Sequence, residues 1–278
     1  MGEPQAHSRV KHAFKYDKSI GTTKPAFFKF FLDREIDLAQ ETLTISVHQQ
    51  GARLSNYKLQ GNPNRYQPAS FSIMLFSADG QLIDSCRGVD TFMPTLQPKR
   101  GVLEASGDGY VLMVDSPWEH IPLKSSSSEQ KNYLSICVDI YCPSQHVYLR
   151  QELPSHGFYA VEQAILRHVR ENEQLVEKIS RFPEAYGNRV TYLEDPYFFN
   201  DWHGFAHYAN GSEKIFAMEK NFSGNTGLKV VNQAKLATKL EVVRLEPGEF
   251  KIYLLKRTQA QVKYIPDGKV LPSPSDAP

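Results

Sequence analysis

Short runs of alternating apolar and polar residues recur along the first half of the chain. Residues 43–48 alternate strictly and predict a half-buried strand, whereas residues 71–76, 110–115 and 133–141 are denser apolar runs that predict buried strands. No helical period separates these runs. Short strands that follow one another without helices are typical of antiparallel sandwiches, so we expect a β-sandwich over residues 25–150.

Turn residues punctuate both halves of the chain. Asp79-Gly80 separates two apolar runs and predicts a β-hairpin. Asn210-Gly211 follows the aromatic run 205–209 and precedes the run 213–222, so it predicts a second hairpin with a type I′ turn.

Further strand signals follow in the second half. Residues 228–231 and 240–245 read as short strands, and Pro247-Gly248 predicts a type II turn that leads into a strand over 250–256. We therefore expect a second β domain over residues 191–265.

Residues 158–182 change to a helical period. Their apolar positions fall three and four residues apart and form one stripe, and Pro183 follows. The stripe consists of Val161, Ile165, Val169, Val176 and Ile179, widened by Leu166, Leu175 and Phe182. We expect a linker helix within residues 151–190 that packs against one or both sheets, in preference to a coiled coil or a membrane surface. Together the patterns predict a mainly β protein with two antiparallel β-sandwich-like units joined by one amphipathic helix.

The two ends differ from the middle of the chain. Residues 1–24 are basic and contain few large apolar side chains, so they read as an extended leader that is either disordered or ordered against a partner. Residues 266–278 are rich in proline and predict a disordered tail. The candidate partner-binding residues are the leader residues Arg9, Lys11, Phe14, Lys15 and Tyr16, together with the loop cations Lys99 and Arg100.

Composition excludes some classes of function. The 278 residues carry a formal net charge of +1, so no global field favours nucleic acid. No run approaches the roughly 18 apolar residues of a membrane span, and the first residues lack the apolar core of a secretory signal. We therefore expect a cytoplasmic protein whose three cysteines, Cys86, Cys137 and Cys142, are free thiols.

A search for catalytic and metal-binding patterns finds none that is complete. His203 and His207 are four residues apart, but no third ligand follows with metal-site spacing, so we expect packing or surface histidines. Cys86 has Arg87 beside it but no base at a recognisable spacing. The sequence shows no nucleophile elbow, phosphate loop or dinucleotide fingerprint. We expect no cofactor, no metal and no enzymatic activity.

Two stretches resemble a known family. Residues 109–118 (Gly-Tyr-Val-Leu-Met-Val-Asp-Ser-Pro-Trp) and 133–141 are similar to the calpain-type β-sandwich that follows the protease core in calpains. The second half resembles the terminal β domain of protist calpain-like proteins, on residues 204–210, on the run 228–231 and on the Pro-Gly turn that enters 251–256. The motifs of the papain-like core, with its Cys, His and Asn, have no counterpart here. The resemblance thus implies tandem calpain-type domains without a protease.

The resemblance also sets the functional expectation. It implies a non-catalytic structural or interaction protein, a scaffold component associated with the cytoskeleton or a cilium, with tubulin or axonemal proteins as candidate partners. Two alternatives remain open. One is a peripheral lipid- or calcium-responsive regulatory module, and the other is a cryptic cysteine-dependent hydrolase that uses Cys86 or the pair His203 and His207.

Overall fold

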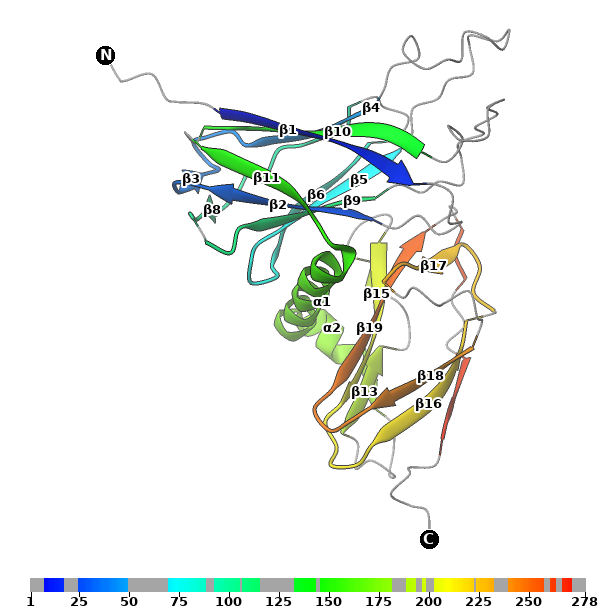
Figure 1. Cartoon of the computed structure of the whole chain (residues 1–278). Coiled ribbons are helices and arrows are strands. Elements are labelled where there is room, and N and C mark those ends of the chain that lie inside the picture. Colours follow the sequence, from blue (N-terminus) through cyan, green and yellow to red (C-terminus); the bar gives the residue numbers. More distant parts are fainter. Residues whose placement is uncertain are drawn as a thin grey trace, which may run out of the picture. The chain divides into compact units, whose positions relative to one another are not determined.

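The described residues of the computed structural model form mainly strands, with one long and one short helix, and the chain divides into two compact units, Met1–Ala164 and Ile165–Pro278 (Figure 1). The prediction of a mainly β protein with antiparallel sheets is confirmed. The structure describes residues 8–17, 25–49, 70–88, 93–105, 107–115, 133–143, 146–181, 189–193, 197–198, 203–222, 224–232, 240–257, 261–263 and 267–271. Within these ranges, the side chains of 14–17, 133–135, 180, 240 and 267–268 are not described.

Two antiparallel sheets form unit 1. Sheet A has the order β1 (Ser8–Asp17), β10 (Tyr133–Cys142), β4 (Thr44–Gln49) and β7 (Thr95–Leu96). Sheet B has the order β11 (Val147–Glu152), β2 (Ala26–Leu32), β9 (Tyr110–Asp115), β5 (Phe71–Phe76) and β6 (Leu82–Gly88). A short ribbon pairs β3 (Ile36–Asp37) with β8 (Val102–Leu103). Successive side chains of a strand point to opposite faces, so each sheet contributes alternate residues to one shared apolar core.

The hairpin predicted at Asp79-Gly80 is confirmed. β5 pairs with β6, and Gly80 adopts a φ of 85°, which favours glycine. The same glycine also makes room for a helix. A Cβ atom at position 80 would lie 2.7 Å from Cβ of Gln163 in α1 (Pro154–Glu171), so this turn serves both chain reversal and packing.

A second glycine seats the first turns of α1 on sheet B. Gly157 faces the ring of Phe27, and a Cβ atom there would lie 2.0 Å from the ring. Phe158 meets the same ring edge-on at a centroid distance of 5.0 Å. Any larger residue at position 157 would therefore push α1 away from the sheet.

The structure corrects the expectation of an extended leader over residues 1–24. Ser8–Asp17 form the edge strand β1, and all ten residues pair with β10 of the same unit. Alternation explains this placement, since Val10 packs against the core and the His12 ring contacts Phe28 at 5.6 Å, while Arg9 and Lys11 point outward. The arm thus orders against its own sandwich.

The predicted helix is shorter than the pattern implied. Val161, Ile165 and Val169 are buried, which confirms the stripe in α1. The helix then ends at Glu171, and Asn172 caps a separate turn, α2 (Glu173–Glu177), by accepting a hydrogen bond from the amide of Leu175. Beyond the break Leu175 is still buried, as the widened stripe predicted, but Val176 is 51% exposed and Ile179 lies at the start of strand β12 (Ile179–Arg181). Phe182 lies outside the described residues.

Two further sheets form unit 2. Sheet D has the order β12, β13 (Val190–Leu193), β15 (His203–Asn210), β19 (Phe250–Arg257) and β17 (Leu228–Val230), with β14 (Tyr197–Phe198) also paired to β15. Sheet E has the order β18 (Leu240–Leu245), β16 (Phe216–Asn221) and β20 (Asp267–Val270). Tyr208 and Tyr253 of sheet D and Phe216 and Val243 of sheet E belong to one apolar core.

The hairpin predicted at Asn210-Gly211 is wrong. β15 pairs with β13 and β19, whereas β16 belongs to the other sheet. The Asn210 side chain explains why the chain crosses to the other sheet. Its Nδ2 donates to the carbonyl of Lys214 at 2.8 Å and to that of Leu245 at 2.9 Å. Its Oδ1 accepts from the backbone amide of Ser212 at 3.0 Å and from the Ser212 hydroxyl at 2.6 Å. This closed set of hydrogen bonds fixes a corner between the sheets instead of a reversal within one.

Two other expectations about the second half can be compared with the structure. The type II turn at Pro247-Gly248 is confirmed, since Gly248 has a φ of 82° and the amide of Glu249 donates to the carbonyl of Glu246 at 3.0 Å. The tail prediction is corrected for Asp267–Val270, which pairs with β16, and residues 272–278 lie outside the described residues.

Candidate functional site

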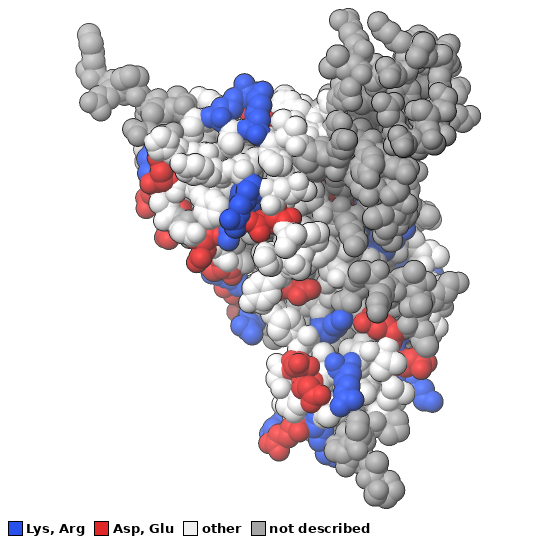
Figure 2. Space-filling view, in the orientation of Figure 1, with Lys and Arg blue, Asp and Glu red and all other residues white. Residues whose placement is uncertain are grey.

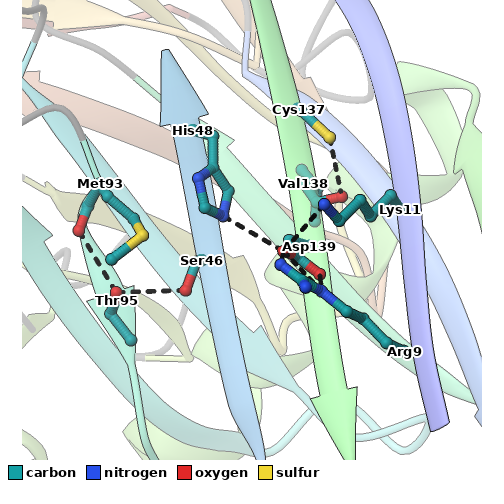
Figure 3. A network of polar contacts seen from close by, with 9 residues as sticks. All are labelled: Arg9, Lys11, Ser46, His48, Met93, Thr95, Cys137, Val138 and Asp139. Carbon is teal, nitrogen blue, oxygen red and sulfur yellow. Dashed lines mark hydrogen bonds and ion pairs between the residues drawn. The ribbon is translucent and has the colours of Figure 1, made fainter.

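A charged cluster lies on the outward face of sheet A, with Asp139 at its centre (Figure 3). The strand register places Asp139 of β10 between Lys11 of β1 and Ser46 of β4, with Thr95 of β7 next in the same row. The neighbours of Asp139 along β10, Val138 and Ile140, are fully buried in the core. Alternation therefore turns Asp139 away from the core.

Three cationic or titratable side chains converge on this carboxylate. Arg9 Nε donates to Oδ1 at 2.9 Å and to Oδ2 at 3.1 Å, and Arg9 Nη2 makes a further close contact with Oδ2. Lys11 Nζ lies 3.9 Å from Oδ2 and His48 Nε2 lies 3.3 Å from it, both as ion-pair contacts without hydrogen-bond geometry. The hydrogen bonds from Arg9 lower the pKa of Asp139, against the opposing effect of burial, so the carboxylate is ionised at neutral pH.

Burial is very uneven within the cluster. The Asp139 side chain is 6% exposed, whereas the side chains of Arg9 and Lys11 are each 55% exposed and that of His48 is 36% exposed. The anion thus lies beneath its cations. Figure 2 shows one group of Lys and Arg atoms over the region where Figure 1 shows β1 and β10, and other groups elsewhere on this side of the molecule.

Polar and exposed apolar side chains surround the cluster. Ser46 Oγ and Thr95 Oγ1 are 3.2 Å apart, and Gln97 Nε2 donates to Thr44 Oγ1 at 3.1 Å. Tyr141 is 41% exposed and Met93 is 50% exposed. We call this surface the sheet A outer face, which comprises Arg9, Lys11, Ala13, Thr44, Ser46, His48, Met93, Thr95, Gln97, Cys137, Asp139 and Tyr141.

The structure brings together only some of the residues proposed from sequence. Arg9 and Lys11 lie side by side on the sheet A outer face. Phe14, Lys15 and Tyr16 lie on β1, but their side chains are outside the described set. Lys99 and Arg100 are exposed in the segment after β7, and no described contact joins them to Asp139.

Sequence reasoning missed Asp139, His48, Tyr141 and Met93. Part of the signal was present, because a single aspartate inside the apolar run 133–141 must face away from the core or find a cation. Its cation comes from a strand 130 residues earlier, and no local pattern reveals that pairing.

The thiols of Cys86 and Cys137 lie in surroundings that keep them protonated. Burial, followed by the nearby Asp84, raises the pKa of Cys86 to about 11. Burial also raises the pKa of Cys137, with Asp139 adding to the effect. Because the thiolate is the nucleophile, neither side chain is set up for nucleophilic chemistry at neutral pH.

The two histidines of β15 lie in packed surroundings. His203 is fully buried and His207 is 5% exposed. Burial, with the charge of Arg170 adding to it, lowers the pKa of His207 to about 4. The His168 ring, whose pKa burial also lowers, contacts Tyr197 at 5.3 Å. In the described part of the chain, no group of three or more His, Cys, Asp or Glu residues is arranged to hold a metal ion.

Comparisons with known proteins identify no family. No protein-family model and no curated protein matches the chain. Among solved structures, an oxalate decarboxylase studied for its substrate binding mode and reaction specificity switch aligns with 95% of this chain and 68% of its own, at 9% identity and a TM-score of 0.17. Such a score carries no argument about fold or function. Neither described helix is long and apolar enough to cross a membrane.

Proposed function

We propose that this protein is a non-catalytic interaction protein, a scaffold component of a larger assembly that docks a protein partner on the sheet A outer face. The observation that carries the proposal is the make-up of that face. Exposed Tyr141, Met93 and Arg9 belong to the residue types enriched at protein interfaces, and Arg9 is held on a regular sheet by its ion pair with the nearly buried Asp139 carboxylate.

The rigidity of the face supports this proposal. Its side chains stand on four hydrogen-bonded strands whose inward residues form the core of unit 1. Docking on such a surface orders few groups that were free beforehand, so little conformational entropy opposes binding. The resemblance to calpain-type β domains adds the class of assembly, a cytoskeletal or ciliary one, with tubulin or axonemal proteins as candidate partners.

The two alternative functions receive less support. A cysteine-dependent hydrolase needs an accessible thiolate, and the raised pKa values of Cys86 and Cys137 oppose one. A calcium-responsive module needs clustered oxygen ligands, and the described residues hold no such cluster.

Graded extraction of cells that express the protein tests the proposal. Cells are lysed in detergent, and the insoluble fraction is washed with rising salt. A face variant, Lys11→Glu with Met93→Ser and Tyr141→Ser, is compared with a matched unit 2 variant, Lys269→Glu with Val242→Ser and Phe250→Ser, whose original side chains are also exposed.

We expect the unit 2 variant to stay in the insoluble fraction like the natural protein and the face variant to move to the soluble fraction. Equal retention of both variants, or a natural protein that is entirely extracted by detergent alone, contradicts the proposal. Because all six side chains are exposed, each substitution should change stability by no more than about 1 kcal/mol, a bound that includes the like-charge pair that Lys11→Glu forms with Asp139 across the strands. Thermal unfolding of both purified variants checks this requirement.

A further inference from the structure

Arg9 and Lys11 form a regularly spaced pair of cations. They are two residues apart on β1, so both side chains leave the strand on the sheet A outer face. A strand rises about 3.4 Å per residue, which sets the two positions about 7 Å apart. The hydrogen-bonded pairing of β1 with β10 fixes these backbone positions, while the charged ends of both side chains converge on Oδ2 of Asp139.

The pair retains hydrogen-bonding capacity. Asp139 engages Nε and Nη2 of Arg9, and no described hydrogen bond uses Nη1. The 3.9 Å between Lys11 Nζ and Asp139 exceeds hydrogen-bond length, so the Lys11 ammonium makes only an ion-pair contact there. Both side chains are 55% exposed, which leaves their remaining donors within reach of a second molecule.

The charge of the cluster favours an anionic partner. Two permanent cations face one carboxylate, and that carboxylate is 6% exposed beneath them. A molecule that approaches the face therefore meets the cations and not the anion. Asp139 acts as a positioning residue, since it holds the Arg9 guanidinium on the face.

We propose that the sheet A outer face binds an extended acidic segment of a partner protein in which two carboxylates alternate, as in Glu-x-Glu. This inference rests on the proposed function and names the chemistry of the partner. In an extended segment, residues i and i+2 point to the same side about 7 Å apart, which matches the backbone positions of Arg9 and Lys11. The flexible glutamate side chains of such a segment can follow the two cations where these converge above Asp139. Tyr141 lies directly across from Arg9 on the neighbouring strand and offers the segment an apolar contact.

Two synthetic peptides of equal length and charge test the spacing. The first carries two glutamates in alternation, and the second carries them at adjacent positions, which point to opposite sides of an extended chain. Binding of each fluorescent peptide to the full-length protein is measured by anisotropy at about 0.05 M and about 0.15 M salt. We expect the alternating peptide to bind about tenfold more tightly at both salt concentrations.

Charge reversal locates the site. Lys11→Glu should weaken binding of the alternating peptide at least about tenfold, because it replaces an attraction with a repulsion. The control Lys269→Glu makes the same change of net charge on an exposed lysine of unit 2 and should alter binding less than about twofold. Lys11 is preferred to Arg9 for this test, because the loss of Arg9 would leave a nearly buried carboxylate without its hydrogen bonds.

The outcomes separate this inference from the proposed function. Equal binding of the two peptides overturns it, and so does an equal effect of Lys11→Glu and Lys269→Glu. If the face variant leaves the insoluble fraction of cells while the peptides bind equally, the docking face stands and the acidic class of partner is wrong. If neither the extraction nor the peptides respond to the face, both proposals fall.

Discussion

The charged cluster of unit 1 and the buried polar groups of unit 2 are placed in opposite ways. In unit 1 the charged cluster around Asp139 lies on an outer sheet face, with cations that remain half-exposed. In unit 2 several polar groups are enclosed, since Asn210, Lys220 and Lys256 are each 1% exposed and His207 is 5% exposed. The comparison indicates that the Asp139 cluster keeps charged atoms available to a second molecule, whereas these groups of unit 2 are enclosed within it, and Asn210 holds the corner between its two sheets.

The protonation states of Asp139 in unit 1 and His207 in unit 2 also differ. Asp139 is buried but has a cation within hydrogen-bond distance, so its pKa is lowered and it keeps its charge. His207 is buried beside the cation Arg170, so its pKa is lowered as well, but for a histidine this means that the neutral form is favoured.

The largest expected effect comes from the corner of unit 2. Asn210→Ala removes the four hydrogen bonds that its side chain makes, and at about 1 kcal/mol each we expect a loss of about 4 kcal/mol. Asn232→Ala removes two hydrogen bonds to β19 and should cost about half as much. Urea unfolding measures the loss of unfolding free energy in each variant. Equal losses in the two variants would show that Asn210 has no special role at the corner.

Acid should act first on unit 2. Since the pKa of His207 in the folded state is about 4 and its ordinary value is 6.5, the unfolded chain binds the proton first as pH falls. The contribution of neutral His207 to the free energy of unfolding is therefore fully present above about pH 6.5, and up to about 3 kcal/mol of it is lost as pH falls toward 4. His207→Gln should flatten this slope in a series of unfolding curves.

Asp139 provides the contrast in unit 1. Its pKa is lowered from an ordinary value of 3.8, so its contribution is present above that value and is lost only as pH falls through the lower folded-state pKa. Hydrogen exchange between pH 4 and 6.5 should therefore rise in β15 before it rises in β10. An earlier rise in β10 would contradict this order.

A smaller loss of stability is expected when the carboxylate at the centre of the unit 1 cluster is neutralised. Asp139→Asn keeps the shape of the side chain but removes its charge, and because Arg9 and Lys11 can be solvated we expect a cost of about 1–2 kcal/mol. The amides of β1 should exchange faster while those of β5 stay protected, since the described β1 side chains contribute no fully buried residue to the core. Glu104→Gln, an exposed change of the same kind in unit 1, serves as the control.

The smallest effect on stability is expected on the exposed part of the sheet A outer face. Lys11→Glu and Tyr141→Ser should each lower the free energy of unfolding by no more than about 1 kcal/mol, because both side chains are exposed and the new glutamate opposite Asp139 can turn toward solvent. A loss above about 1 kcal/mol in either variant would mean that the face is part of the fold and not a surface kept for a partner.

Local patterns in the sequence were sufficient for several elements. The alternation of residues 43–48 and the apolar run 71–76 predicted strands that the structure contains, and the stripe of Val161, Ile165 and Val169 predicted the buried side of α1. The turn chemistry of Asp79-Gly80 and Pro247-Gly248 was also sufficient, since the required φ depends on the residue itself.

Only the tertiary structure decided which strands are neighbours. Asn210-Gly211 looks like a hairpin in the sequence, yet the chain crosses to another sheet because the Asn210 side chain binds a carbonyl 35 residues later. β1 looked like a leader because few of its residues are large and apolar, and its partner β10 lies more than a hundred residues away. The sequence by itself thus determined the type of most elements, through period and turn chemistry. The pairing of strands, and with it the cluster around Asp139, depends on contacts between distant segments that no local pattern encodes.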